Sequence, residues 1–225
     1  MNRMIIVAAA AVVGLGAAYF YTSSSDTTAL PTPGASAEAA TSDGAEAVDT
    51  SGILEMFQGE ADAPVTVVEY ASFTCPHCKS FHVDTYGGVK ENYVDTGKVK
   101  FVLREVYFDR FGLWAGMVAR CGGPEKYFGI VDILFKEQSD WLAGGDPNTV
   151  AANLRKIGIR AGIDGEAVDA CMLDNDKAQA MVALFQQTTE ADGVRGTPTF
   201  VIDGKSHSNM NYADFSKLLD GELAK

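Results

Sequence analysis

The most constraining feature of the sequence is a pair of cysteines, Cys75 and Cys78, placed directly after a short apolar run. Residues 65–70 read Val-Thr-Val-Val-Glu-Tyr, and this β-branched, apolar composition predicts a buried strand. Pro76 suits the first position of a helix, where its missing backbone N–H costs nothing. The motif Cys-Pro-His-Cys is therefore expected at the start of a helix that follows a buried strand.

This position determines the chemistry of the two sulfurs. Residues three apart share a helix face, so Cys75 and Cys78 can bond, but the ring is too small for a useful structural bridge. Free N–H groups and the helix dipole favour the thiolate of Cys75, and His77 can add a donor or a positive charge. Cys78 is expected to be more buried. A stabilised thiolate stabilises the reduced form, so the disulfide should be a strong oxidant.

Two other uses of these cysteines remain open. Cys75, Cys78 and His82 could supply three zinc ligands, although structural zinc takes four and no second closely spaced pair follows. The protein could instead be a non-enzymatic binder of peptides or of copper(I), which prefers thiolate ligands, although its methionines do not cluster.

The first part of the chain predicts export. Arg3 precedes an apolar run over residues 4–21, the pattern of a signal peptide, and its length also allows a membrane anchor. Residues 22–51 are rich in Ala, Ser and Thr, carry acidic but no basic side chains, and are expected to form a disordered linker. The folded part should therefore cover residues 52–225.

Charge and cysteine content narrow the class of protein further. The 18 basic and 30 acidic residues give a net charge of −12, which argues against a nucleic-acid partner because phosphate binding needs clustered Lys and Arg. Four cysteines are too few for a disulfide scaffold, and an even number is typical of an oxidising compartment.

The remaining pattern predicts an α/β domain with an insertion. Further strands are expected over about 99–107 and over 199–202, and Asp203-Gly204 predicts a hairpin turn. Helical patterns broken by Gly and Pro occupy residues 108–192, and Asn211 can cap a last helix. The order indicates a small sheet domain with about 80 helical residues inserted in its middle.

Two segments of the sequence resemble those of a known family. The segment from Glu69 to Cys78, with Pro76 inside the Cys-Pro-His-Cys motif, and the later pair Thr197-Pro198 are similar to the DsbA-type thiol:disulfide oxidoreductases. The resemblance covers the folded region. It implies a thioredoxin-like fold with an inserted all-helical domain, in which the core takes about 52–107 and 193–225 and the insertion about 108–192.

The resemblance also implies a role for each matching residue. Cys75 is expected to be the nucleophile, Cys78 its buried partner, and His77 the histidine that stabilises the thiolate. Thr197 and Pro198 match the pair whose cis-proline loop faces the disulfide and binds the substrate backbone. No cofactor is implied beyond the redox-active disulfide itself.

The resemblance also extends to residues outside the Cys-Pro-His-Cys motif. Glu69 matches a buried acid that could relay the proton of Cys78, and Leu103 stands where some relatives carry a lysine that pairs with this acid. In an exported protein we expect Cys121 and Cys171 to form a disulfide, which should contribute about 3–4 kcal/mol to the free energy of unfolding. Two free buried thiols are the alternative.

The predicted function is oxidation of thiols in reduced, unfolded exported polypeptides. The resemblance implies a periplasmic monomer that a quinone-linked membrane protein of the DsbB type reoxidises. The alternative within the same chemistry is a disulfide isomerase or reductase. Such relatives generally dimerise through an added N-terminal domain, whereas residues 22–51 show no apolar heptads.

Overall fold

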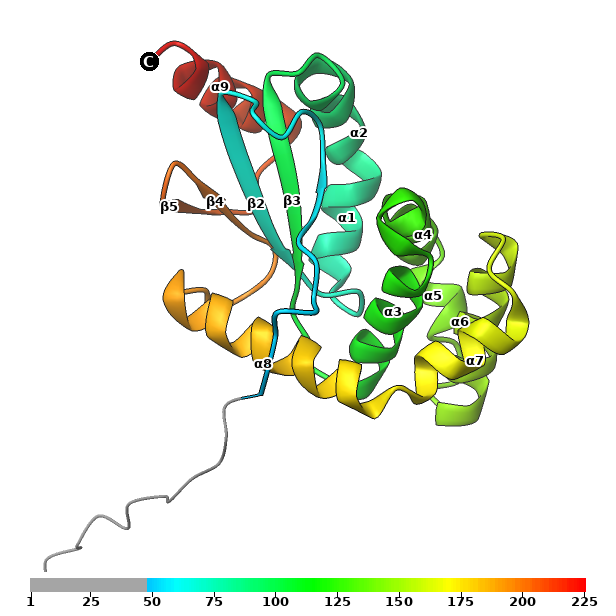
Figure 1. Ribbon diagram of the computed structural model, residues 1–225. Helices are drawn as coiled ribbons and strands as arrows, with labels where there is room; N and C mark the ends of the chain where they lie inside the picture. The colour runs from blue at the N-terminus through cyan, green and yellow to red at the C-terminus, as the bar shows by residue number, and fades with distance from the viewer. Residues whose placement is uncertain (1–47) are drawn as a thin grey trace, which may run out of the picture. The chain divides into compact units, whose positions relative to one another are not determined.

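A five-stranded sheet lies at the centre of the computed structural model, which describes residues 48–225 (Figure 1). The strand order is β1-β3-β2-β4-β5, and only β2 and β3 run parallel. The strands are β1 (Met56–Gln58), β2 (Val65–Ala71), β3 (Val99–Glu105), β4 (Thr199–Ile202) and β5 (Lys205–Ser208).

The helices fall into three groups along the chain. One group lies between β2 and β3, a second between β3 and β4, and a last helix follows β5. The helices are α1 (Pro76–Asp84), α2 (Tyr86–Val89), the π-helix η1 (Lys90–Val94), α3 (Arg110–Cys121), α4 (Gly123–Lys136), α5 (Gln138–Trp141), α6 (Pro147–Arg160), α7 (Gly165–Leu173), α8 (Asn175–Ala191) and α9 (Tyr212–Leu223).

The helical segment between β3 and β4 confirms the predicted α/β architecture with an insertion. In Figure 1, α3 to α7 gather beside α1, and α8 returns along the end of the central strands. Two cores result. One joins the inserted helices to Phe73 and Cys78, and the other joins the sheet to α1 and α9 around Phe81, Phe200 and Phe215.

Short polar side chains define where five helices begin. Each residue before the helix has a side-chain oxygen that accepts a backbone N–H of the first turn, which satisfies a donor that has no partner within the helix. Asn211 caps α9 as predicted. The others are Asp109 for α3, Asp146 for α6, Asp164 for α7 and Asp174 for α8.

The predicted strands are present, including the one after the hairpin turn, and one further strand, β1, was missed. The hairpin turn is confirmed, since Asp203 and Gly204 have positive φ of 49° and 71° between β4 and β5, as a type I′ turn requires. Strand β3 ends at Glu105, two residues before the predicted end. Strand β1 is three residues long and is held by antiparallel pairing to β3, so it is too short to show a period in the sequence.

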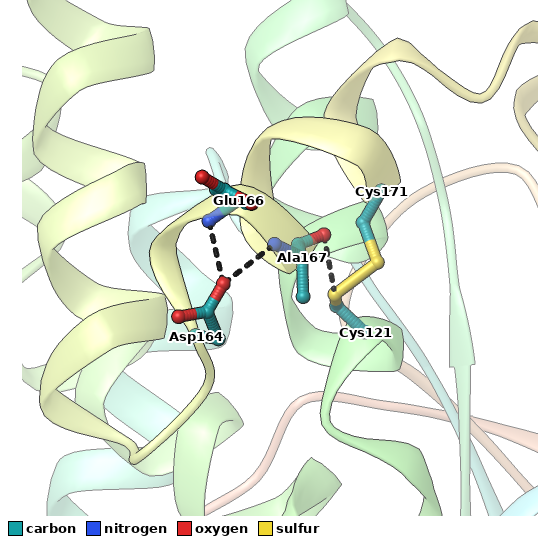
Figure 2. The surroundings of a disulfide bond; sticks show 5 residues. All are labelled: Cys121, Asp164, Glu166, Ala167 and Cys171. Carbon is teal, nitrogen blue, oxygen red and sulfur yellow. Dashed lines mark hydrogen bonds between the residues drawn. A yellow bond between two sulfur atoms is a disulfide. The ribbon is translucent and has the colours of Figure 1, made fainter.

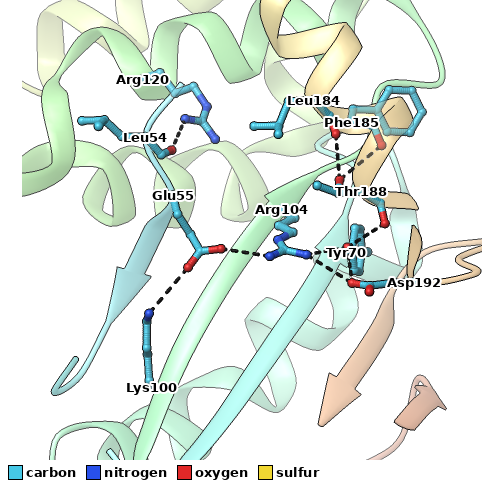
Figure 3. Close-up of polar contacts among 10 residues, drawn as sticks. All are labelled: Leu54, Glu55, Tyr70, Lys100, Arg104, Arg120, Leu184, Phe185, Thr188 and Asp192. Atoms are coloured by element: carbon cyan, nitrogen blue, oxygen red, sulfur yellow. Dashed lines mark hydrogen bonds and ion pairs between the residues drawn. The ribbon is translucent and has the colours of Figure 1, made fainter. Parts of the chain in front are cut away.

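Buried and half-buried charges attach the insertion to the sheet. Arg104 on β3 donates to the Tyr70 hydroxyl at 2.8 Å and pairs with Asp192 after α8 at 3.1 Å, while Tyr70 donates to the same carboxylate at 2.5 Å (Figure 3). On α3, Arg120 forms a buried pair with Glu105 at 2.5 Å. Both α3 and the end of α8 are therefore fixed against β3.

A disulfide joins Cys121 at the end of α3 to Cys171 in α7, the pairing expected for an exported protein (Figure 2). The carbonyl of Ala167, one turn before Cys171, lies 3.5 Å from the Cys121 sulfur. The bond closes a loop with a sequence separation of 50 residues and ties together two helices of the insertion.

The predicted export segment over 4–21 and nearly all of the predicted linker over 22–51 lie outside the described residues. Within residues 48–225, no helix combines the length and apolar character needed to cross a bilayer.

Candidate active site

Cys75 occupies the residue before α1, with extended backbone angles of −81° and 121° and Pro76 in the first helical position. Its backbone N–H donates to the Ser72 carbonyl at 3.1 Å, which closes a tight turn between β2 and α1. The sulfur is half-buried, whereas Cys78, one turn further along, is fully buried. The predicted difference in exposure between the two cysteines is therefore present.

Hydrogen bonding lowers the pKa of Cys75 to about 5. The thiol of Cys78 is the largest cause. Burial opposes the shift, and further donors support it: the Thr197 side chain and the backbone N–H groups of Cys78 and His77. Because these donors stabilise the charged form more than burial penalises it, Cys75 is a thiolate at neutral pH.

Cys78 has the opposite character. Burial raises its pKa far above the ordinary value, and the negative charges of Cys75 and Glu69 raise it further. The two sulfurs therefore differ in acidity as well as in access to solvent: Cys75 is a half-buried thiolate and Cys78 is a fully buried thiol.

The loop before β4 lies against the Cys75 sulfur. The Thr197–Pro198 peptide bond is cis, and the Thr197 carbonyl lies 3.5 Å from Cys75 Sγ. Pro198 is buried, and so is the Thr197 hydroxyl beside it. The loop thus presents a backbone edge next to the reactive sulfur although it is 122 residues away in sequence.

His77 acts on Cys75 through its backbone. Its side chain is exposed, and the contribution to the lowered pKa of Cys75 comes from its N–H group. The sequence predicted a side-chain donor or charge. Within residues 48–225 the imidazole makes no hydrogen bond to the cysteine, so the position in the first helical turn supplies the effect.

Glu69 lies in the centre of β2 and is completely buried. Its Oε2 is 2.8 Å from Nε2 of His82 on α1, and its Oε1 has no partner in the described part of the chain. Leu103 is the residue opposite Glu69 on β3, where the resemblance had implied a lysine in some relatives. The acid's partner is therefore a histidine on the neighbouring helix instead of a cation on the neighbouring strand.

The contact between Glu69 and His82 also concerns the alternative of a zinc site at Cys75, Cys78 and His82. His82, the third ligand that the alternative required, is bonded to Glu69. Among residues 48–225 no group of three or more His, Cys, Asp or Glu side chains is arranged to hold a metal ion.

The insertion holds the active-site turn through a residue that sequence reasoning missed. The buried amide of Gln138, at the start of α5, donates to the carbonyls of Phe73 at 2.8 Å and Cys75 at 3.0 Å. Thr74 donates to Asp109, the capping residue of α3, at 2.8 Å. No local pattern marks Gln138, because its partners lie 63 and 65 residues earlier.

Comparisons with known proteins agree with this geometry. The family model described as "Thioredoxin" matches residues 52–221. A Rickettsia bellii protein named "Putative protein-disulfide oxidoreductase" is 32% identical over 74% of this chain and 63% of its own length. "Disulfide bond formation protein D" of Bacillus subtilis is 27% identical over 73% of this chain and 75% of its own length. The chain spans only 60–63% of the length of the five Rickettsia relatives.

Solved structures show the same fold. Alpha-DsbA1 of Wolbachia pipientis superimposes with a TM-score of 0.69 at 26% identity, over 76% of this chain and 91% of that chain. The oxidised BdbD of Bacillus subtilis gives 0.68 at 22% identity, over 76% and 94%. Since the family model covers most of the sequence and the architecture is that of the DsbA structures, this chain belongs to the thioredoxin family.

Proposed function

We propose that this protein is a thiol:disulfide oxidoreductase that introduces disulfides into exported polypeptides by exchange at Cys75 and Cys78. One observation carries the proposal: the pKa of the accessible cysteine is lowered to about 5 while that of its buried partner is raised. A cysteine that is ionised at neutral pH is a good leaving group, and it stabilises the reduced form of the pair.

The cycle starts from the Cys75–Cys78 disulfide. A substrate thiolate attacks the Cys75 sulfur, the bond to Cys78 breaks, and Cys78 departs with the electron pair and takes up a proton. A second thiolate of the substrate then attacks its own sulfur in the mixed disulfide, and Cys75 departs as a stable thiolate. The substrate is oxidised by two electrons, and both cysteines are left reduced.

The surroundings of Cys75 suit an unfolded chain. The Thr197 carbonyl beside Cys75 belongs to a backbone segment that an extended substrate can pair with. Phe108 is 61% exposed and precedes Asp109, which is bonded to the active-site turn. An apolar side chain at this place can contact the apolar residues that unfolded polypeptides expose.

Glu69 is the candidate acid–base group for Cys78. It is buried, its charge raises the pKa of Cys78, and one of its oxygens has no hydrogen-bond partner within residues 48–225. The partner that regenerates the disulfide is proposed to be a quinone-linked membrane protein of the DsbB type, and the compartment to be the periplasm. These two assignments depend on the resemblance and on the apolar run over 4–21.

Oxidation of a reduced, unfolded substrate with several cysteines tests the proposal. The oxidised protein should form substrate disulfides stoichiometrically in a single turnover, and Cys75→Ser should abolish this. The Cys121→Ala, Cys171→Ala double variant is the matched control, since it removes the other cysteine pair and should retain oxidation. Reshuffling of a scrambled substrate or reduction of insulin that is faster than oxidation would instead identify an isomerase or reductase. Tight copper(I) retention that blocks exchange would identify a binding protein.

A further inference from the structure

A cavity of about 130 Å³ lies between the end of β3, α8 and the segment that precedes β1. Figure 3 shows several of the side chains that line it: Leu54 before β1, Arg104 on β3, and Leu184 and Phe185 on α8. None of the residues that surround Cys75 lines this cavity. The cavity is therefore separate from the active site.

The cavity lies on the face of the sheet opposite α1. Glu69 of β2 contacts His82 on α1, and successive side chains of a strand point to opposite faces, so Tyr70 points away from α1. The Tyr70 hydroxyl accepts a hydrogen bond from Arg104 at 2.8 Å, and Arg104 lines the cavity. The cavity and α1, which carries Cys78, are therefore on opposite faces of the sheet.

Apolar side chains form most of the cavity wall. Leu103 and Met181 are almost completely buried, and the rings of Tyr107 and Phe185 meet edge to face with their centroids 5.8 Å apart. An apolar cavity of roughly 150 Å³ lined by Leu, Ile and Phe can bind benzene. The volume and the wall therefore suit one six-membered ring.

Tyr107 also brings a hydrogen-bond donor to the cavity. Burial raises the pKa of its hydroxyl well above the ordinary value, and the charge of Glu105 raises it further, so the hydroxyl stays protonated. Arg104 brings a second donor, because its hydrogen bonds within residues 48–225 use Nη1 and Nη2 and leave the Nε–H group. The site can therefore donate hydrogen bonds to a ligand.

The carboxylates that line the cavity are already engaged. Glu105 accepts hydrogen bonds from Arg120 and from the Tyr127 hydroxyl, and Glu55 pairs with Arg104. The two arginines and two glutamates in the wall also balance in charge. Since burial of a further, unpaired charge is costly, the site suits a ligand that accepts a hydrogen bond and carries no charge.

We propose that this cavity binds a small neutral aromatic molecule with a carbonyl group attached to its ring. The ring occupies the apolar part beside Leu103 and Met181, and the carbonyl oxygen accepts a hydrogen bond from Tyr107. The donors favour this class over a plain hydrocarbon, and the balanced charge favours it over an aromatic carboxylate. The proposal does not depend on the function of the two active-site cysteines.

Acetophenone is a simple probe of this class, and NMR of the full chain detects its binding. The methyl signals of Met181 and Leu184 should shift in a saturable way, with a Kd in the millimolar range that is expected for so small a ligand. Benzoate should bind more weakly, because its charge has no counterpart in the cavity. Binding of benzoate that is as tight as that of acetophenone, or tighter, would refute the proposed class of ligand.

Tyr107→Phe tests the hydrogen bond while it keeps the ring. The variant should weaken the binding of acetophenone roughly fivefold, the loss expected for one neutral hydrogen bond, and should leave the binding of toluene unchanged. Toluene is the matched ligand because it has the ring without the carbonyl group. An equal effect on both ligands, or no effect on acetophenone, would contradict the proposal.

Leu184→Trp fills the cavity and should abolish the shift of the Met181 methyl signal. Gln187→Trp is the matched control, because it adds the same side chain at an exposed position of α8 and should leave binding unchanged. Saturable binding that persists in Leu184→Trp, or the absence of a saturable shift in the unaltered protein, would overturn the proposal. The unaltered protein and Tyr107→Phe decide the question if Leu184→Trp folds poorly.

Discussion

Replacement of Cys78 by Ala should raise the pKa of Cys75. The Cys78 thiol is the largest cause of the lowered value, and the backbone donors and Thr197 remain in the variant. A hydrogen bond to a charged group contributes about 1.5–3 kcal/mol, and one pH unit corresponds to about 1.4 kcal/mol. The midpoint is therefore expected to move from about 5 to between about 6 and 7.

The consequences for reactivity are large at low pH. With a pKa of about 5, Cys75 in the unaltered protein has about 100 thiolates per thiol at pH 7 and equal amounts at pH 5. In Cys78→Ala the thiolate fraction at pH 5 should fall to roughly a tenth or less of the total. The rate of alkylation by iodoacetamide follows this fraction.

The assay is the pH dependence of thiolate absorbance, checked by the alkylation rate. The unaltered reduced protein should show one thiolate per chain with a midpoint near 5, because Cys78 stays protonated. The Cys121→Ala, Cys171→Ala variant should have the same midpoint. A midpoint for the unaltered protein near the ordinary cysteine value of about 8.5, or no change in Cys78→Ala, would refute this explanation of the Cys75 environment.

The same shift predicts how pH affects the stability of the reduced protein. A group with a lowered pKa in the folded state adds stability that is present above its unfolded pKa and lost as pH falls through its folded pKa. Ionised Cys75 should therefore stabilise the reduced form at neutral pH, with the contribution lost below about pH 5. The oxidised form lacks this dependence because neither sulfur titrates.

Three stability predictions concern parts of the fold away from the cysteine motif. The Cys121→Ala, Cys171→Ala variant should lower the free energy of unfolding by about 4 kcal/mol, the loop-closure value for the 50-residue separation. Arg120→Met leaves a buried carboxylate unpaired and should cost about 3–5 kcal/mol. Gly59→Ala should cost about 1–3 kcal/mol or more, because φ is +90° and a Cβ would lie 2.4 Å from the Val99 carbonyl oxygen. Denaturant titration measures all three.

Matched variants define what would contradict these values. Lys136→Met removes an exposed ion pair with Asp132 and should change the free energy of unfolding by at most about 1 kcal/mol. Gly193→Ala has positive φ but no atom within 4 Å of the new Cβ, so it should be milder than Gly59→Ala. Equal effects within either pair would show that burial or close approach is not the cause. A Cys121→Ala, Cys171→Ala variant as stable as the parent would show that the closed loop contributes nothing.

The sequence predicts those parts of the fold that local chemistry determines. The run before Cys75, the Asp203-Gly204 turn and the cap at Asn211 each combine a residue preference with a single local conformation, and all three are present. Strand β1 was missed because three residues carry no period, and its position depends on pairing with β3.

In the active site, too, the features that depend on local sequence were predicted and those that depend on tertiary packing were not. The exposure of Cys75 and the burial of Cys78 follow from their places on one helical turn. The sequence indicates His82 only as a possible zinc ligand, because its spacing from Cys78 is visible in the sequence. Its contact with Glu69 depends on the packing of α1 against β2, which the sequence does not show. The two hydrogen bonds of Gln138 depend on how the insertion returns to the active-site turn, which no local pattern records.

The redox equilibrium of the Cys75–Cys78 pair with glutathione tests most directly whether the thiolate of Cys75 makes this protein an oxidant. We expect a reduction potential above about −200 mV, more oxidising than the glutaredoxins, since the reduced form is stabilised by the ionised sulfur. A potential at or below that value would contradict an oxidising role for the pair.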